Sequence, residues 1–329
     1  MTGTSPSKLD QLKSMTTVVA DTGDMDSIRA FAPVDATTNP TLILKAAQLP
    51  AYEPLVAEAV AWGASHGRLT SEVADRLAIN FGEELTKIVP GRVSTEVDAD
   101  LSFDVEGTIE KARAIIADYA RRGVGRERIL IKIAATWEGI RAARVLQEEG
   151  IDCNMTLVFS LAQAAACADA GAFLISPFVG RILDWHVKAT GASFTAETDP
   201  GVSSVRQIYD YYKAHGLSTI VMGASFRNVG EIEALAGCDR LTIAPQLLDE
   251  LARDVGPLPR RLTPDVPAER APARLSLDEK TFRFLLNEDA MASEKLSDGI
   301  RQFSRDLRAL RELVSKRLRA SADSAFADL

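Results

Sequence analysis

The chain has 329 residues, of which 46% are hydrophobic and 26% are charged, and its formal net charge is −8 at pH 7. This composition is typical of a globular protein that is long enough to bury a sizeable core. The acidic balance argues against a general nucleic-acid binder, and no uninterrupted apolar run approaches membrane-spanning length, so neither nucleic acid nor a membrane is expected as a partner.

The first third of the chain alternates between short apolar or β-branched segments and helical patterns. We predict a strand at 16–20, which ends before Asp21, and a short strand at 35–38, which Asn39 and Pro40 end. A third strand is predicted at 93–97, after a long region of Ala-rich helical content. Helices are predicted at 7–14, 25–32, 41–66 and 70–88.

The middle of the chain continues the same alternation, and glycines such as Gly150 and Gly216 end the helical patterns. Strands are predicted at 128–135, 152–159, 172–176, 219–222 and 239–244. Helices are predicted at 105–121, 137–149, 161–170, 182–187, 205–214 and 229–235. Eight strands that alternate with helices predict an α/β protein whose parallel sheet closes into a single (β/α)8 TIM barrel.

The pattern changes after Pro245. A stretch rich in Pro and Arg, at 257–273, is expected to cross the surface without regular structure. Two further helices are predicted, at 277–287 and 292–318. We therefore expect one barrel domain over 1–319, in which 246–319 supply helices that pack on the barrel, and a disordered tail at 320–329.

The predicted strand at 128–135 carries one lysine among aliphatic residues. Ile129, Ile131 and Ile133 help to make both of its faces apolar, which fits a parallel strand that is covered on both sides. Because lysine is almost never fully buried without a partner, Lys132 is either a strand-end residue paired with a carboxylate or a group that does chemistry. An amine that burial keeps neutral is a nucleophile for carbonyl carbon.

Polar residues follow seven of the predicted strands, and a (β/α)8 barrel brings such strand ends to one pocket. Each residue also has a simpler explanation. Asp21 could shape a turn, Glu96 could be only the ion partner of Lys132, and Asn154 and Thr156 could satisfy backbone groups. Convergence on one pocket is what favours function. The set comprises Asp21, Thr37, Asn39, Glu96, Lys132, Asn154, Thr156, Ser176, Ser225 and Arg227.

These residue types support the cleavage of a ketose. A neutral Lys132 attacks a ketone to form an iminium, which is an electron sink for breaking a carbon–carbon bond. Asp21 and Glu96 are the carboxylates at these strand ends that can move the protons. Amides and hydroxyls such as those of Asn39 and Ser176 can hold sugar hydroxyls.

Two later strand ends predict an anion site. The stretch 176–181 brings Arg181 and the stretch 223–228 brings Arg227, each beside glycine or serine. Arginine matches the geometry of phosphate, and phosphate sites of such barrels often lie near the last strand–helix loops. The alternative is a structural ion pair of Arg181 with Asp184 or Glu231.

The positions of the cysteines and histidines in the sequence bear on the cellular compartment and on the kind of catalytic site. The three cysteines form no CxxC pair, which favours reduced thiols and an intracellular, cytoplasmic location, and residues 1–10 show no signal-peptide pattern. The three histidines lie far apart in the sequence, so a histidine metal site or a Ser-His-Asp triad is not expected.

Seven stretches, in chain order, resemble motifs of the transaldolase family, and the resemblance runs from about Leu9 to about Leu318. Alanine stands at 135, where many relatives carry serine. The stretches are TVVADTG (17–23), DATTNP (35–40), PGRVSTEVD (90–98), ILIKIAATWEG (129–139), CNMTL (153–157), ISPFVGR (175–181) and MGASFR (222–227).

The resemblance implies a Schiff-base enzyme that needs no metal or cofactor. It would move a dihydroxyacetone unit from sedoheptulose 7-phosphate to glyceraldehyde 3-phosphate, which gives erythrose 4-phosphate and fructose 6-phosphate in the pentose phosphate pathway. Lys132 would form the Schiff base, Asp21 would take the C4 hydroxyl proton, and Glu96 would act through a water that Thr156 helps to hold. The implied substrate-binding set is Asn39, Asn154 and Ser176 for the three-carbon unit, Arg181, Ser225 and Arg227 for phosphate, with Thr37 and Phe178 beside them.

The long C-terminal helical region resembles the dimer-forming branch of the family, so a homodimer is expected. Two other functions remain open at this point. One is a silent sugar-phosphate binder, which the presence of Lys132, Asp21 and Glu96 disfavours. The other is a fructose 6-phosphate aldolase-type enzyme that releases free dihydroxyacetone, and Phe178 bears on this choice because transfer requires that water be kept from the iminium.

Overall fold

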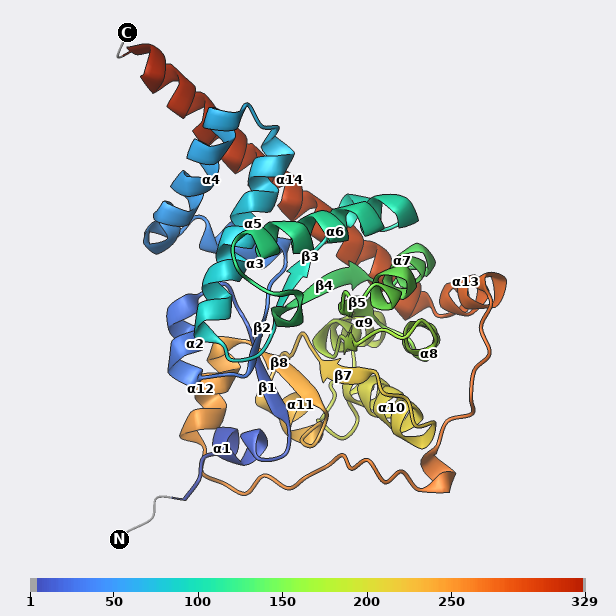
Figure 1. Ribbon diagram of the computed structural model, residues 1–329. Coiled ribbons are helices and arrows are strands. Elements are labelled where there is room, and N and C mark those ends of the chain that lie inside the picture. Colours follow the sequence, from blue (N-terminus) through green and yellow to red (C-terminus); the bar gives the residue numbers. More distant parts are fainter. Residues whose placement is uncertain (1–4, 328–329) are drawn as a thin grey trace.

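The computed structural model describes residues 5–327 and contains a closed barrel of eight parallel strands in chain order (Figure 1). The predicted (β/α)8 TIM barrel, with additional helices at both ends of the chain, is confirmed. The strands are β1 (Thr17–Asp21), β2 (Asp35–Thr37), β3 (Val93–Glu96), β4 (Ile129–Ala134), β5 (Cys153–Val158), β6 (Leu174–Pro177), β7 (Ile220–Gly223) and β8 (Arg240–Ile243).

Helices surround the barrel, and those predicted at 70–88 and 105–121 have the predicted bounds. No helix within residues 5–327 is both long and apolar enough to cross a membrane. The helices are α1 (Lys8–Lys13), α2 (Met25–Phe31), α3 (Pro40–Ala46), α4 (Glu53–His66), α5 (Thr70–Ile88), α6 (Val105–Arg121), α7 (Trp137–Glu148), α8 (Leu161–Asp169), α9 (Gly180–Thr190), α10 (Pro200–Ala214), α11 (Val229–Ala234), α12 (Pro245–Arg253), α13 (Glu279–Glu288) and α14 (Ala290–Ala327).

Three segments differ most from the prediction, and proline explains two of them. The single helix expected at 41–66 is divided into α3 and α4 by a turn at Pro50. Helix α12 was not predicted, because Pro245 was interpreted as the end of the pattern, whereas proline is well suited to the first turn of a helix. The tail expected at 320–329 is helical as far as Ala327, where alanine favours helix, and residues 328–329 lie outside the described part.

The interior of the barrel explains why polar groups gather at one end. Val19, Leu130, Leu174 and Met222 form a buried apolar layer inside the barrel, contributed by four strands. Alternate residues of a strand point to the same side, so the residue two positions beyond a member of this layer also points inward. For β4 that residue is Lys132, and the same step on β1 and β6 leads to the next inward-facing positions at the carboxyl ends.

Helix α14 lies against the carboxyl end of the barrel and contacts α3, α4, α5, α9 and β5 (Figure 1). Leu157 in β5 has a left-handed backbone with φ of 56°, at an irregularity in the β5–β6 pairing. A Cβ atom on Gly299 of α14 would lie 2.6 Å from Leu157 Cδ2, so glycine permits this close approach. We call the buried set between α14 and the strand ends the mouth cluster: Ala99, Ala134, Leu157, Phe159, Phe178, Ile182, Ala224, Met291, Ala292, Leu296 and Phe303.

Candidate active site

A cavity of about 220 Å³ lies at the carboxyl ends of the strands, under the mouth cluster. Most of the predicted residues line the cavity: Asp21, Thr37, Asn39, Lys132, Ser176, Phe178, Arg181, Ser225 and Arg227. The other three, Glu96, Asn154 and Thr156, have buried side chains in the strands beside it. The structure therefore brings the predicted set together at one end of the barrel.

Lys132 is enclosed, with only 5% of its surface exposed. Its Nζ atom lies 3.4 Å from Glu96 Oε2 and donates a hydrogen bond of 3.3 Å to the carbonyl oxygen of Thr38. Residues 96 and 132 are direct partners in the β3–β4 pairing, which explains their closeness. The pairing with a carboxylate that the sequence allowed is thus present, and the amine also faces the cavity, where it can reach a bound carbonyl group.

Asp21 lies at the end of β1 and is oriented by two threonines. Thr37 Oγ1 donates a hydrogen bond of 2.9 Å to Asp21 Oδ1 and lies 2.8 Å from Thr242 Oγ1. Burial raises the pKa of Asp21 above its usual range, although the positive charge of Lys132 opposes the rise. A carboxyl group with a raised pKa beside a cavity is suited to taking up and returning a proton.

Glu96 has a raised pKa for the same reason, since burial disfavours its charge and Lys132 offsets only part of that effect. Its Oε2 atom is at ion-pair distance from Lys132 but accepts no hydrogen bond from the residues that the structure describes. Thr156 Oγ1 is also buried without a hydrogen-bond partner in residues 5–327. Buried polar atoms are normally satisfied, so each of these two atoms is suited to binding a small polar molecule.

A chain of hydrogen bonds runs through the wall beside Lys132. Ser176 Oγ donates to Asn154 Oδ1 at 2.7 Å, and Asn154 Nδ2 donates to Ser94 Oγ at 3.0 Å. Asn154 is fully buried and does not line the cavity, whereas Ser176 does. The geometry makes Asn154 a residue that orients Ser176 and places Ser176 where it can meet a ligand.

Asn39 both caps a helix and lines the cavity. Its Oδ1 atom accepts a hydrogen bond of 2.9 Å from the N–H of Leu42, and it caps α3, whose first residue is Pro40. The capping bond uses only the carbonyl oxygen of the side chain, so the amide N–H groups remain to donate to a ligand.

Arg181 is the strongest candidate for holding an anion. Its guanidinium carbon lies 4.9 Å from the ring centroid of Phe178 and 5.6 Å from that of Phe303. Burial lowers the pKa of Arg181, and the neighbouring charge of Arg227 adds to this effect. Among residues 5–327 it forms neither an ion pair nor a hydrogen bond, so a half-buried positive charge faces the cavity without a protein partner.

Arg227 differs, because its Nη2 atom lies 2.7 Å from Asp184 Oδ2. The ion pair with Asp184 that we considered for Arg181 is therefore made by Arg227. Ser225 has a left-handed backbone with φ of 62°, and its carbonyl oxygen accepts a hydrogen bond of 2.7 Å from the N–H of Gly180. This bond ties the segments after β6 and β7 together and places both arginines on one side of the cavity.

Five lining residues escaped the prediction: Ala224, Phe226, Thr242, Ala244 and Phe303. Thr242 lies in β8, and the rule that polar residues mark strand ends would have found it if applied to that strand. Phe303 comes from α14, so no argument from strand ends could reach it. Its ring centroid is 5.8 Å from Lys132 Nζ.

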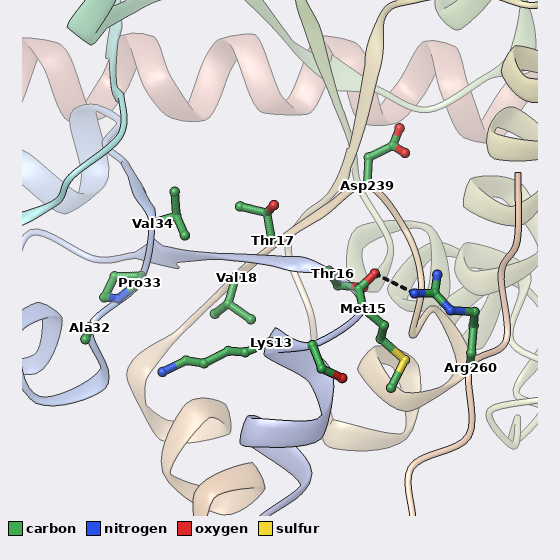
Figure 2. A pocket seen from close by; sticks show the side chains of 11 residues that line it. Lys13, Met15, Thr16, Thr17, Val18, Ala32, Pro33, Val34, Asp239 and Arg260 are labelled. Carbon is green, nitrogen blue, oxygen red and sulfur yellow. Dashed lines mark hydrogen bonds between the residues drawn. The ribbon is translucent and has the colours of Figure 1, made fainter.

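A second hollow of about 390 Å³ lies at the opposite end of the barrel, where β1 begins (Figure 2). Its polar groups are already engaged: Lys13 Nζ donates to the carbonyl oxygen of Phe31 at 2.6 Å, and Arg260 donates to that of Met15 at 3.4 Å. Active sites of these barrels lie at the carboxyl ends of the strands, so we assign the chemistry to the smaller cavity.

Comparisons with known proteins agree with this geometry. Residues 18–314 match the family model described as Transaldolase/Fructose-6-phosphate aldolase. A protein of Rhizobium etli named Transaldolase is 64% identical over 320 residues, which cover 96% of this chain and 99% of the relative. Proteins with the same name are 65% identical in Agrobacterium fabrum, with the same coverage, and 58% identical in Cellvibrio japonicus, over 94% of this chain and 99% of the relative.

Proposed function

The chain belongs to the transaldolase/fructose-6-phosphate aldolase family and is a transaldolase, and from this premise we propose how its residues carry out the transfer. A dihydroxyacetone unit would pass from sedoheptulose 7-phosphate to glyceraldehyde 3-phosphate, giving erythrose 4-phosphate and fructose 6-phosphate. The observation that carries the proposal is the enclosed amine of Lys132, which lies 3.4 Å from Glu96 and faces the same cavity as Asp21.

The reaction begins when the neutral amine of Lys132 attacks the ketone carbon of the donor. The resulting carbinolamine loses water to give an iminium. Asp21 then takes the proton of the C4 hydroxyl group, the bond between C3 and C4 breaks, and its electrons pass into the iminium to form an enamine. The aldose leaves, the acceptor aldehyde adds to the enamine carbon while Asp21 returns the proton, and hydrolysis of the new iminium releases the product.

Glu96 and Thr156 would serve the formation and loss of the carbinolamine. Both have a buried oxygen without a hydrogen-bond donor in the described chain, and a water held between them would carry protons to and from the nitrogen. We assign Ser176, oriented by Asn154, and Asn39 to the hydroxyl groups of the three-carbon unit. Thr37 keeps Asp21 in position.

The phosphate group would lie against Arg181, Ser225 and Arg227. Support comes from the half-buried guanidinium of Arg181, which has no ion partner within residues 5–327. Burial lowers the pKa of Arg181, which means that its charge is less stable there than in water, and a bound phosphate would stabilise that charge. The ion pair with Asp184 leaves Arg227 with a weaker share in this contact.

Transfer, as opposed to release of free dihydroxyacetone, requires that the enamine and iminium be kept from bulk water. Phe178 is 6% exposed and Phe303 is 2% exposed, and both line the cavity. This enclosure and the names of the relatives favour transfer over the fructose 6-phosphate aldolase-type reaction.

We further propose that the enzyme acts in the cytoplasm as a homodimer, on sugar phosphates and without a metal or cofactor. The compartment is supported by three buried cysteines that form no disulfide, Cys153, Cys167 and Cys238. The dimer is supported by the resemblance of the C-terminal helical region to the dimer-forming branch of the family. Sedimentation of the full chain would test the dimer.

Borohydride reduction in the presence of fructose 6-phosphate tests the mechanism. Mass spectrometry should locate the reduced three-carbon adduct on Lys132, and Lys132→Ala should form no adduct while it keeps its circular dichroism spectrum. An adduct on another residue, or full activity of Lys132→Ala, would refute the Schiff base proposed here. Turnover of fructose 6-phosphate that ignores erythrose 4-phosphate would instead favour the simple aldolase.

A further inference from the structure

The backbone of the segment 225–227 is hydrogen-bonded to a buried glutamate, Glu231. Glu231 Oε2 accepts a hydrogen bond of 2.6 Å from the backbone N–H of Arg227. Asn228 caps α11 by accepting the N–H of Glu231 at 3.0 Å, so the glutamate reaches back across the start of its own helix. Glu231 is fully buried, and no cation within residues 5–327 forms an ion pair with it.

A second acid lies beside the carboxyl group of Glu231. Its Oε1 atom is buried and finds no hydrogen-bond donor among the described residues. The side chain of Asp199 is within hydrogen-bonding range of the Glu231 carboxyl group. Asp199 is itself 3% exposed and caps α10 by accepting the N–H groups of Gly201 and Val202 at 2.7 and 3.2 Å. Two ionised carboxylates can only accept, so their contact is a hydrogen bond only when one of them carries a proton.

This contact connects the start of α10 to the proposed anion site. A Cβ atom on Gly201 would lie 2.1 Å from the carbonyl oxygen of Val179, so α10 packs directly on the residue before α9. Val179 donates its N–H to Ala224 at 2.8 Å, and Gly180 donates to Ser225 at 2.7 Å. The left-handed backbone of Ser225 is unfavourable for a non-glycine residue and depends on such surroundings.

We propose that Glu231 and Asp199 share one proton, and that this carboxyl pair is a positioning element that holds Ser225 and Arg227 for the anionic end of the substrate. The inference rests on the phosphate site proposed above. Neither acid touches the reacting carbons, so the pair acts through the segment that it holds.

None of the other charged groups around the pair forms an ion pair with it in the described chain. The side chain of Arg227 turns to Asp184 of α9. Arg206 of α10 donates from Nη2 to the carbonyl oxygen of Ala234, and its Nε atom is buried without a hydrogen-bond partner among residues 5–327. Lys8 of α1 is paired with Glu233 on α11. Because none of these cations is at ion-pair distance from Glu231 or Asp199, a shared proton is the means by which the two acids can lie side by side.

A dependence on pH follows. Burial raises the pKa of Glu231 to about 7, and the negative charge of Asp199 adds to the rise. Below this pH the pair is bonded, whereas above it two carboxylates repel and the segment loosens. At pH 8 about one tenth of the pairs keep the proton, so the KM for a phosphorylated donor rises by at most about tenfold through this cause.

The test compares the KM for fructose 6-phosphate between pH 6 and pH 8, with erythrose 4-phosphate as acceptor, in the wild type, Glu231→Gln and Asp199→Asn. The carbonyl group of glutamine can accept from Arg227 and its amide can donate to Asp199, without titrating. We expect both variants to keep a KM near that of the wild type at pH 6 and to lose the rise toward pH 8, with little change in kcat. Ratios of KM to the wild type cancel the titration of the substrate phosphate.

Glu233→Gln is the matched control, because it removes a charge from the same helix at a residue paired with Lys8. It should follow the wild-type profile. The pair is refuted if Glu231→Gln shows the wild-type rise, if Glu233→Gln loses it as well, or if Glu231→Gln is as impaired at pH 6 as Glu231→Ala. If Glu231→Gln does not fold, Asp199→Asn decides by the same criterion. Borohydride trapping at Lys132 is recorded at each pH: its absence in the wild type overturns the proposed function, whereas normal trapping with unchanged profiles overturns only the pair.

Discussion

Replacing Phe303 with alanine should separate transfer of the three-carbon unit from its loss to water. The ring is 2% exposed and lies 5.8 Å from Lys132 Nζ and 5.6 Å from the guanidinium carbon of Arg181. Truncation of a buried phenylalanine costs about 3–5 kcal/mol of unfolding free energy. Loss of a ring beside a cation costs about 1 kcal/mol, which lowers the rate through a cationic iminium about fivefold.

The assay has two readouts. Urea unfolding measures the loss of stability, and turnover of fructose 6-phosphate with and without erythrose 4-phosphate measures how much free dihydroxyacetone is released per transfer. We expect Phe303→Ala to release more, because the opened cavity admits water to the enamine. Phe282→Ala is the control: Phe282 on α13 is 1% exposed and packs on Trp137 with ring centroids 5.3 Å apart, and it does not line the cavity.

Phe282→Ala should lose a similar amount of stability and keep the release ratio of the wild type. If both variants lose stability and neither changes the ratio, Phe303 only fills the core, and the water exclusion assigned to it is wrong. If both change the ratio, loosening of the whole fold is the cause, and the ring has no particular role.

Further predictions address the anion site, the proton transfers and the effect of pH. Arg181→Ala should raise the KM for phosphorylated substrates by roughly 10- to 100-fold and leave the KM for free dihydroxyacetone nearly unchanged. Arg227→Ala should raise the KM for phosphorylated substrates by a smaller factor, because Arg227 already forms an ion pair with Asp184. An equal rise in KM for both kinds of substrate would show that the substituted arginine does not belong to the anion site. Asp21→Asn should lower kcat by roughly 100- to 10,000-fold and still form the borohydride adduct; an absent adduct would assign Asp21 to an earlier step. Because the pKa of Glu231 is raised to about 7, the folded chain binds this proton more tightly than the unfolded chain, so wild-type stability falls as pH rises toward 7. Glu231→Gln should remove at most about 2 kcal/mol of the fall in unfolding free energy between pH 5.5 and pH 8, measured by urea unfolding. An equal fall in the variant and the wild type would contradict the assignment.

Most of the strands were predictable because they are short apolar or β-branched runs that end at glycine or at a polar residue, as parallel strands buried on both faces require. The bounds of the helices were harder to predict at prolines, because a proline can follow the end of one helix or begin the next. Pro245 can end one element or begin the next, and only the burial of Leu247, Leu248 and Leu251 in a helix that packs on α1, α2 and α11 shows which.

The site was predictable as far as the strands determine it. Lys132, Asp21 and Glu96 follow from strand register and from the inward-facing alternation, which are properties of the local sequence. The partner of each arginine was not predictable, because the backbone bonds between the segments after β6 and β7 decide which guanidinium reaches Asp184. Phe303 was not predictable for the same reason, since the docking of α14 depends on contacts such as that of Gly299 with Leu157.

The ring of Phe303 belongs to a helix that follows all eight strands in the chain. A translating ribosome therefore delivers every strand of the barrel before it delivers the side chain that closes the cavity. A chain at that stage lacks the ring that lines the cavity beside Lys132. Newly made protein would thus transfer the three-carbon unit between sugars, without losing it to water, only after α14 has packed on the barrel.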